Sequence, residues 1–374
     1  MIARAIPVLC VGLAVALQSA TCGQAAGGPP EPVRPPRPSS WTLSPSNPLI
    51  AISRTPDGLS GGGKGPQIWN DPSVLQEDGG YSMWASMGHG GPKGVAIYKL
   101  RSRDGLTWTV DNGGKAVLEP GDRGKDFDWF GVETPSVIKV GDRYHMYYSV
   151  YPDGKIPLVT MGHAVSRDGV HWDKQGELRS VTEPVGRHEG NPWGRLARAE
   201  PAVLYRDGTF YLYFTDVRCR TADCKGDVPV IRGISLATSR DGQTFQQRGT
   251  EPVLMPGAPY TADERWEGYS TPAVVMHDGV THLFCDVFRK AGKDSVQEAI
   301  AHFQSRDGVS FELVEPDIVT AGADWAAVSV RSPSVLIDGG TWKMWFAGDN
   351  YDPNRGKPRG RIEAGIGLAT KNLR

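Results

Sequence analysis

Short runs of aromatic and β-branched residues recur along the chain, each bounded by glycine, aspartate or proline. The runs are short, and their apolar residues do not repeat every three or four positions as in an amphipathic helix. Aromatic and β-branched residues favour strands. The clearest runs span residues 81–85, 144–148, 210–214, 282–285 and 342–346. This pattern predicts an all-β chain.

A repeat unit precedes each of these runs. Each copy carries a proline followed by Ser or Ala and then Val, and a turn leads from this motif into the aromatic run. The five prolines are Pro72, Pro135, Pro201, Pro272 and Pro333, which lie 63, 66, 71 and 61 residues apart. Self-similarity at a fixed period predicts an architecture built from repeated structural units.

A second motif, Ser-Arg-Asp-Gly, follows in four of the five copies, starting at Ser102, Ser166, Ser239 and Ser305. Asp-Gly between apolar runs is a strong signal for a tight turn, because glycine accepts a positive φ. Each unit therefore contains two hairpins and four strands. The sequence predicts a five-bladed β-propeller in which this turn is structural.

The fifth copy ends near Thr370, where its fourth strand should follow. The N-terminal segment 41–52 contains Asn47-Pro48-Leu49-Ile50, which resembles Glu251-Pro252-Val253-Leu254 in the fourth strand of the third unit. We expect this segment to supply the missing strand, because closing the ring leaves no open sheet edge.

The N-terminus has the features of an export signal. Arg4 precedes an apolar stretch, 6–17, that is too short to span a bilayer. We expect a signal peptide over 1–26, a Pro/Gly-rich linker over 27–40 and the propeller catalytic domain over 41–374. This predicts a secreted or periplasmic protein without a membrane span, with a lipid anchor at Cys22 as the less favoured alternative.

Charge and cysteines narrow the picture further. The formal net charge is -1, which excludes a basic field that would attract nucleic acid or anionic membranes. We expect a monomer that binds a neutral oligo- or polysaccharide. Cys219 and Cys224 bracket a short polar loop and are predicted to form a disulfide in an oxidising compartment. Cys285 lies among apolar residues and is predicted to be a buried free thiol.

Asn70-Asp71-Pro72, the five repeats and the Ser-Arg-Asp-Gly-x-x-Trp/Phe turns resemble the five-bladed glycoside hydrolases of families 43 and 32 and the related family 130 phosphorylases. The resemblance covers residues 41–374. It implies that Asp71 is the general base or nucleophile of the first blade and that Glu200 is the acid of the third. Glu133 is the nearest second-blade acid, although Thr134 holds the place directly before the proline.

The chemistry gives an independent reason to expect acids here. Glycosidic bonds are cleaved by two carboxyl groups, one of which protonates the leaving group while the other activates water or attacks. Crowded acids raise one another's pKa, which keeps one of them protonated. The alternative is that acid-Pro pairs only mark strand starts. Against this, Thr271 and Ser332 stand at the same place in units four and five, so the architecture does not require an acid.

Further candidates are residues that could contact a sugar. Trp69 and Trp129 could stack on sugar rings, although packing between blades is the alternative for such large aromatic residues. Arg331 could meet a substrate hydroxyl or a carboxylate. His89, His163 and His188 are expected in solvated loops, with a place on the axis for one of them as the alternative. No metal ligand set is found and no cofactor is expected, with a structural calcium in the channel as an open alternative.

The sequence thus predicts a secreted glycosidase that acts on a furanoside- or pentose-rich glycan of the arabinan, arabinoxylan or fructan type. Paired carboxylates would perform the reaction, with inversion favoured over retention. Two alternatives stay open at this point. The first is a phosphorylase or transferase of the same fold, and the second is a propeller that only binds carbohydrate.

Overall fold

The computed structural model describes residues 39–57, 67–88, 94–150, 160–182, 194–219, 230–255, 266–291, 294–350 and 363–373. Within these ranges nearly all regular structure is β-strand. The exceptions are a short helix, α1 (Arg179–Thr182), and one 3-10 turn, Asn112–Gly114. The predicted all-β chain is therefore confirmed. The predicted signal peptide, Cys22, His89, His188 and Cys224 lie outside the described residues.

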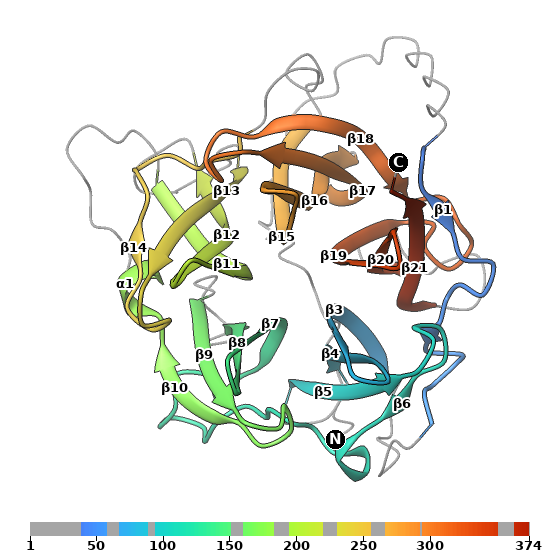
Figure 1. The fold of residues 1–374 in the computed structure, drawn as a ribbon, viewed down its shortest axis with the longest axis horizontal. Coiled ribbons are helices and arrows are strands. Elements are labelled where there is room, and N and C mark those ends of the chain that lie inside the picture. Colours follow the sequence, from blue (N-terminus) through green and yellow to red (C-terminus); the bar gives the residue numbers. More distant parts are fainter. Residues whose placement is uncertain are drawn as a thin grey trace, which may run out of the picture.

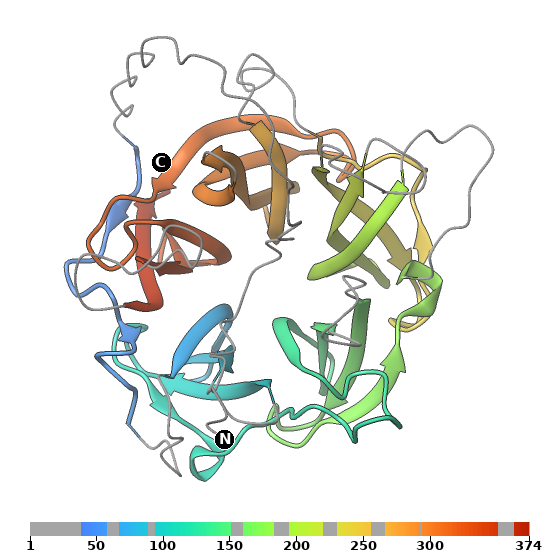
Figure 2. The ribbon, with the colours of Figure 1, turned by 180° about the vertical axis from the view of Figure 1, so that it is seen from behind.

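The strands form five successive antiparallel units arranged around a central axis, with the first strand of each unit nearest that axis (Figures 1 and 2). Units one and two contain β3 (Ile68–Glu77), β4 (Gly80–Gly88), β5 (Val95–Ser102) and β6 (Thr109–Val110), then β7 (Val132–Val140), β8 (Arg143–Val150), β9 (Thr160–Ser166) and β10 (Asp173–Glu177).

Units three and four contain β11 (Gly194–Arg206), β12 (Thr209–Cys219), β13 (Val230–Ser239) and β14 (Gln246–Gln247), then β15 (Trp266–His277), β16 (Val280–Ala291), β17 (Asp294–Ser305) and β18 (Glu312–Thr320). Unit five contains β19 (Ser329–Asp338), β20 (Thr341–Asp349) and β21 (Ala364–Asn372). Consecutive strands pair in each unit, and one parallel contact, Arg232 with Gly268, joins units three and four.

The N-terminal segment completes unit five, as the sequence predicts. Two short strands, β1 (Thr42–Leu43) and β2 (Ile50–Ala51), pair antiparallel with β21. Ile50 lies opposite Ile366, just as Leu254 lies opposite Ile234 in unit three. The alignment of these two segments is therefore correct. The outermost strands of unit five therefore come from the opposite end of the chain.

Aromatic residues on the second strands join neighbouring units. These residues occupy one shared position, represented by Trp84, Tyr147, Tyr213, Phe284 and Trp345. Trp84, Tyr147, Tyr213 and Trp345 each donate a hydrogen bond to the glycine carbonyl of the next unit's Ser-Arg-Asp-Gly turn, at 2.7 to 3.0 Å. Phe284 cannot donate, and the unit that follows it lacks this turn. At the junction of units four and five, the side-chain donor and the turn that would accept its hydrogen bond are thus both absent. Trp41 packs on Phe284 there instead, with ring centroids 5.8 Å apart.

The Ser-Arg-Asp-Gly turns are structural, as predicted. In the first turn, Asp104 Oδ1 accepts hydrogen bonds from the backbone N–H groups of Leu106 and Thr107, both at 2.8 Å. These amides hold the pKa of Asp104 below its usual value. Gly105 has φ 75°, the positive value that the turn requires. The carboxylates of these turns are therefore engaged with their own backbone.

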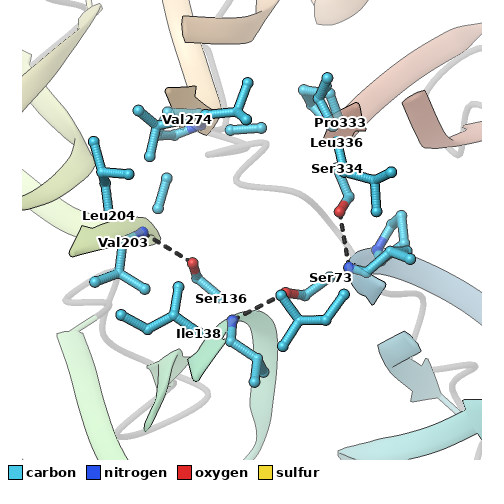
Figure 3. A pocket seen from close by; sticks show the side chains of 18 of the residues that line it. Ser73, Ser136, Ile138, Val203, Leu204, Val274, Pro333, Ser334 and Leu336 are labelled. Atoms are coloured by element: carbon cyan, nitrogen blue, oxygen red, sulfur yellow. Dashed lines mark hydrogen bonds between the residues drawn. The ribbon is translucent and has the colours of Figure 1, made fainter. Parts of the chain in front are cut away.

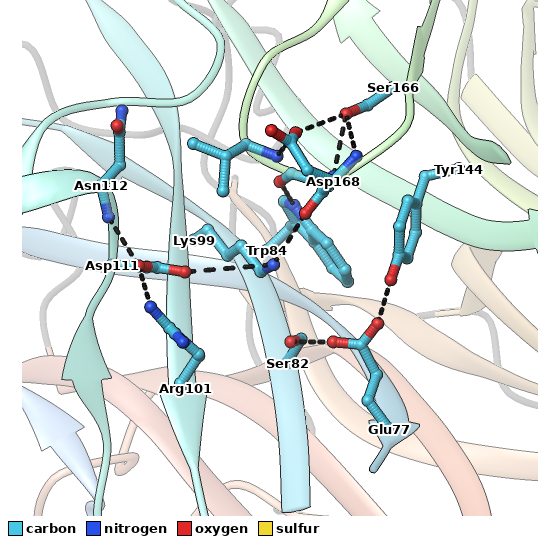
Figure 4. A network of polar contacts seen from close by, with 12 residues as sticks. Glu77, Ser82, Trp84, Lys99, Arg101, Asp111, Asn112, Tyr144, Ser166 and Asp168 are labelled. Atoms are coloured by element: carbon cyan, nitrogen blue, oxygen red, sulfur yellow. Dashed lines mark hydrogen bonds and ion pairs between the residues drawn. The ribbon is translucent and has the colours of Figure 1, made fainter. Parts of the chain in front are cut away.

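Polar contacts also link units one and two away from the start of the inner strands (Figure 4). The Tyr144 hydroxyl and the Ser82 hydroxyl donate to Glu77, and the Lys99 ammonium donates to the Asp168 carbonyl at 3.2 Å. These polar side chains are therefore satisfied by contacts that join the two units. No helix in the described ranges is long and apolar enough to cross a membrane.

Candidate active site

The residue directly before each repeat proline adopts a left-handed backbone conformation. These residues are Asp71, Thr134, Glu200, Thr271 and Ser332, with φ of 49°, 50°, 56°, 47° and 52°. We call them the pre-proline layer. The pairing register with the second strand shifts at the same point in every unit. A non-glycine residue in this conformation costs about 1–3 kcal/mol, and such strain concentrates at functional sites.

Side chains from the preceding unit stabilise this layer. They come from one position on each second strand, fifteen residues after the layer residue of the same unit: Ser86, Ser149, Thr215, Asp286 and Ala347. Ser86, Ser149, Thr215 and Asp286 accept the backbone N–H of the next unit's layer residue at 2.8 to 2.9 Å. Ala347 has no acceptor to offer to Asp71. The strained backbone is therefore held by a ring of acceptors in four of the five interfaces.

Asp71, the predicted first-blade carboxylate, is buried in this layer. Its Oδ1 accepts a 2.6 Å hydrogen bond from the Ser332 hydroxyl. Burial raises the pKa of Asp71, while the Ser332 hydrogen bond, the Arg331 charge and hydrogen bonds from Ser86 and Thr134 oppose that rise. Several groups thus favour the ionised carboxylate, although burial outweighs them.

Glu200, the predicted third-blade acid, occupies the same position two units further on. Its Oε2 lies 3.2 Å from the backbone N of Thr271, which donates to it. Burial raises the pKa of Glu200, and the negative charge of Asp71 raises it further. A hydrogen bond from Thr215 and the charge of Arg232 act in the opposite direction. The charge of Asp71 therefore acts on Glu200, and the role of the two acids as a catalytic pair stays a prediction.

Glu133, the third acid predicted from sequence, has a different place. It is buried on β7, two residues before its proline, and lies opposite Ser149 on β8. This is the position that Arg331 occupies in unit five, and Thr134 takes the layer position in unit two. The structure thus separates Glu133 in position from Asp71 and Glu200, and its role in the reaction stays a prediction.

Two arginines flank the pair of acids. Arg331 is buried and bonds to Ser329 and Asp349, and its charge also acts on Asp71. Arg232 pairs with Glu267 at 3.2 Å, and its guanidinium lies 4.1 Å from the ring centroid of Phe288. Arg331 is thus positioned to tune the charge of the site, and direct contact between Arg331 and a sugar stays a prediction.

A third buried carboxylate, Asp286 on β16, lies in the same network and was not predicted from sequence. Burial raises its pKa well above the usual value, and the charge of Glu200 adds to that rise. The signal that could have identified it is its alignment with Ser86, Ser149 and Thr215, where an acid replaces a hydroxyl. The acid-Pro pattern could not find it, because no proline follows Asp286.

The two predicted tryptophans have different environments. Trp69 is 1% exposed and packs against Tyr98 inside unit one, with ring centroids 5.6 Å apart, which favours the packing role. Trp129 is partly exposed and contacts Phe130 edge-on, and Arg123 lies over its ring at 5.2 Å. Only Trp129 of these two therefore offers a surface that a sugar could reach.

The expectation that His163 lies in a solvated loop is wrong. His163 is buried on β9 and stacks on Tyr147, with ring centroids 4.6 Å apart. It also contacts His145 and Gln243, at 3.2 and 2.6 Å. A histidine on a strand between two units is enclosed by both, which sequence spacing could not show.

The predicted disulfide between Cys219 and Cys224 involves Cys224, which lies outside the described residues. Cys285 is a buried free thiol, as predicted. No group of three or more possible metal ligands was found among the residues that the structure describes.

A channel of about 420 Å³ follows the axis beside the layer. Asp71, Thr134, Thr271 and Ser332 line it, together with the prolines and the small and apolar residues that follow them, whereas Glu200 is not among the lining residues. Two residues beyond the pre-proline layer lies a second ring of positions, the serine layer, formed by Ser73, Ser136, Ala202, Ala273 and Ser334.

Hydroxyls of the serine layer tie the inner strands together (Figure 3). Ser73, Ser136 and Ser334 accept the N–H groups of Val137, Val203 and Val74, each in the next unit, at 2.9 to 3.0 Å. The layer thus joins neighbouring units along one side of the ring.

Comparison with known proteins links this arrangement to carbohydrate enzymes. No family model matches the chain. An uncharacterized protein of Mycobacterium tuberculosis is 25% identical over 247 residues, which cover 65% of this chain and 75% of that protein. A sucrose-6-phosphate hydrolase of Zymomonas mobilis is 29% identical over 154 residues, which cover 37% of this chain and 28% of the hydrolase.

Solved structures match nearly the whole chain. A BT0996 complex with RGII has a TM-score of 0.63 at 14% identity, and the match covers 89% of this chain and 91% of BT0996. A thermostable family-43 glycoside hydrolase has a TM-score of 0.55 at 16% identity, and the match covers 80% of this chain and 89% of the hydrolase chain. A third match comes from family 130, a family of mannoside phosphorylases that contains hydrolases of β-1,2 mannosidic linkages. It has a TM-score of 0.62 at 12% identity and covers 88% of this chain and 93% of the matched chain. The chain therefore shares the fold of the β-propeller glycoside hydrolases, the group that its sequence motifs resemble.

Proposed function

We propose that the protein is a secreted glycoside hydrolase in which the five units are the blades of a five-bladed propeller. Asp71 acts as the general base and Glu200 as the general acid. The substrate is a neutral, furanoside- or pentose-rich glycan of the arabinan, arabinoxylan or fructan type, cleaved with inversion.

The observation that carries this proposal is the location of the two acids. Asp71 and Glu200 occupy the strained pre-proline position in units one and three, and the charge of Asp71 raises the pKa of Glu200. In the other units this position holds Thr or Ser. An acid is thus not needed to build the layer. Two carboxyl groups near one axis are what hydrolysis of a glycosidic bond requires.

The environments of the two acids support these roles. Burial raises the pKa of Asp71, but hydrogen bonds from Ser332, Ser86 and Thr134 and the charge of Arg331 all favour its carboxylate form. Once Asp71 is ionised, its charge raises the pKa of Glu200. Two interacting acids that divide one proton in this way provide a base and an acid at the same pH. Glu200 therefore keeps the proton for the leaving group.

The substrate class is supported by general features of the molecule. The net charge of -1 offers no field for a strongly anionic polymer. Arg331 and Arg232 are engaged by Asp349 and Glu267, so their charges are balanced within the protein. The partly exposed Trp129 provides an apolar face of the kind on which a sugar ring can stack.

The test uses purified protein and a panel of substrates. 4-Nitrophenyl α-L-arabinofuranoside and β-D-xylopyranoside, arabinan, arabinoxylan and inulin are assayed for released product, each with and without inorganic phosphate. We expect hydrolysis of at least one member without phosphate. Strict dependence on phosphate, with release of a sugar phosphate, would instead identify a phosphorylase.

Isosteric variants then test the two acids. Asp71→Asn and Glu200→Gln remove proton transfer while keeping shape, so each should lower turnover by roughly 10²–10⁴-fold or more. Asp338→Asn is a matched control, because Asp338 bonds to Tyr81 and Lys343 at the end of β19, outside the layer. It should keep its turnover. Wild-type turnover in both acid variants would contradict the assignment.

A further inference from the structure

A hydrogen-bonded chain connects Glu200 to Asp286 through Thr271. The backbone N–H of Thr271 is shared between Thr215 Oγ1, at 2.9 Å, and Glu200 Oε2, at 3.2 Å, while the Thr271 hydroxyl donates to Asp286 Oδ2 at 2.7 Å. Thr271 is itself a strained member of the pre-proline layer. A displacement of Asp286 would therefore change the position of the group that holds Glu200.

A second hydrogen-bonded chain connects Asp286 to Asp71 through Ser332. The backbone N–H of Ser332 donates to Asp286 Oδ1 at 2.8 Å, and its hydroxyl donates to Asp71 Oδ1 at 2.6 Å. Each oxygen of Asp286 thus serves one of these two connections. Gln297 and Ser270 also donate to Oδ2, at 2.7 and 3.3 Å, and these hydrogen bonds hold the carboxylate in place.

Comparison of the units shows that the fold alone does not require a carboxylate here. Ser86, Ser149 and Thr215 hold the equivalent position and bind the next layer residue through a single hydroxyl. Asp286 has no exposed surface, and a fully buried carboxylate carries a large desolvation cost. In units one and three a single hydroxyl oxygen, of Ser86 or Thr215, bonds to both its own layer residue and the next one. Asp286 instead uses a separate oxygen for each neighbour, Oδ1 for Ser332 and Oδ2 for Thr271, and so accepts from both at once.

We propose that Asp286 is a positioning residue, which sets the relation between the carboxyl groups of Asp71 and Glu200 by binding Ser332 and Thr271. The inference rests on the proposed function of the two acids. Asp286 acts through its neighbours and does not itself contact the glycan. Its place on the second strand of unit four distinguishes it from the acids that precede the repeat prolines.

The charges around Asp286 explain how it also affects proton affinity. Glu200 raises the pKa of Asp286, while Thr271, Ser332 and Gln297 lower it through hydrogen bonds. Arg331 interacts with both Asp286 and Asp71. Because interacting acids titrate together, removal of one of them lowers the apparent pKa of the protons that the others retain.

The first test replaces Asp286 in two ways. Asp286→Asn keeps the shape but leaves one oxygen, so it breaks or reverses one of the two hydrogen-bonded connections. Asp286→Thr introduces the residue that stands at Thr215 in unit three. Both should fold, with lowered thermal midpoints, because buried donors lose an acceptor oxygen. Turnover of the best 4-nitrophenyl glycoside of the panel should fall about 10–100-fold with KM little changed, since small misplacements of reacting groups have effects of this size.

The second readout is the pH profile of kcat/KM. In Asp286→Asn its basic limb should move to lower pH, because one of the interacting carboxylic acids has been removed. A substrate-independent measurement accompanies it: infrared spectra of the carboxylic C=O stretch, recorded across the pH range. In the unmodified protein this band should persist at pH values above the usual pKa range of carboxylic acids. In Asp286→Asn it should disappear at a lower pH than in the unmodified protein.

Two controls separate positioning from general damage. Cys285→Ala alters the buried neighbour of Asp286 on the same strand, which packs in a different cluster with Tyr213 and Leu283. It should lower stability without moving the pH profile. Ser332→Ala cuts the connection to Asp71, so its effect on turnover should not add to that of Asp286→Asn.

The possible failures are distinguishable. Full activity of Asp71→Asn and Glu200→Gln would overturn the proposed function and the role of Asp286 with it. If those two variants are inactive while Asp286→Asn and Asp286→Thr keep the turnover, pH profile and infrared titration of the unmodified protein, only the role of Asp286 is overturned. Strict additivity of Ser332→Ala with Asp286→Asn would also overturn it.

Discussion

Two layers of the same inner strands differ in how they join neighbouring units. In the serine layer, Ser136 accepts the N–H of Val203 at 3.0 Å. In the pre-proline layer, the N–H of Glu200 donates to Ser149 of the neighbouring unit at 2.8 Å, and Glu200 has a φ of 56°. Hydrogen bonds between units thus form equally well without left-handed backbone. The strained backbone is a property of the pre-proline layer in all five units, and two of these units carry an acid there.

The largest expected effect tests whether both layers depend on closure of unit five. Trimming the chain to begin after Ile52 removes β1 and β2 together with the buried Trp41, Leu49 and Ile50. Each such side chain contributes about 1.5–3 kcal/mol, so the loss approaches the total stability of a typical domain. We expect loss of cooperative unfolding in thermal melts.

A chain beginning at residue 39 is the control for this deletion and should melt like the full protein. An unchanged thermal midpoint after trimming to residue 53 would show that the ring does not need the N-terminal strands.

The second effect concerns histidines that lie between units and outside both layers. Burial is the main cause that lowers the pKa of His163 to about 4 and that of His302 to about 3. The unfolded chain, with a pKa near 6.5, binds protons first as pH falls. Stability is therefore complete above about pH 6.5 and declines below it, by about 1.4 kcal/mol per pH unit for each histidine, until the folded pKa is reached.

Urea denaturation at about pH 7 and pH 5 measures this loss. His163→Gln and His302→Gln should flatten the pH dependence, whereas His171→Gln, at a largely exposed position, should leave it unchanged. Equal pH dependence in all three variants would refute the assignment.

The smallest effect compares the two layers directly. Ser136→Ala and Ser149→Ala each leave one backbone N–H without its acceptor, and each should lower the free energy of unfolding by about 1–3 kcal/mol. Only Ser149→Ala should also lower turnover, because Ser149 holds the backbone of Glu200. Equal turnover in the two variants would show that the layers do not differ in function.

Several features were predictable because they are written in local sequence. The Asp-Gly turns, the repeat of Pro-Ser/Ala-Val and the similarity of 47–50 to 251–254 specify hairpins, units and closure, since turn chemistry and strand propensity act over a few residues. Asp71 and Glu200 were predictable for a related reason, because an acid before a repeat proline differs from Thr and Ser at the same place in other units.

Other features depend on contacts between units. Asp286 has no sequence motif, and its connection to Ser332 exists only because unit five lies beside unit four. Trp69 and His163 have side chains that suit a binding site, yet neighbouring strands enclose both. The sequence by itself determined the repeat, its turns and the two candidate acids. The tertiary structure decided which side chains meet at the axis, because burial and hydrogen bonding there join residues that lie sixty or more positions apart in the chain.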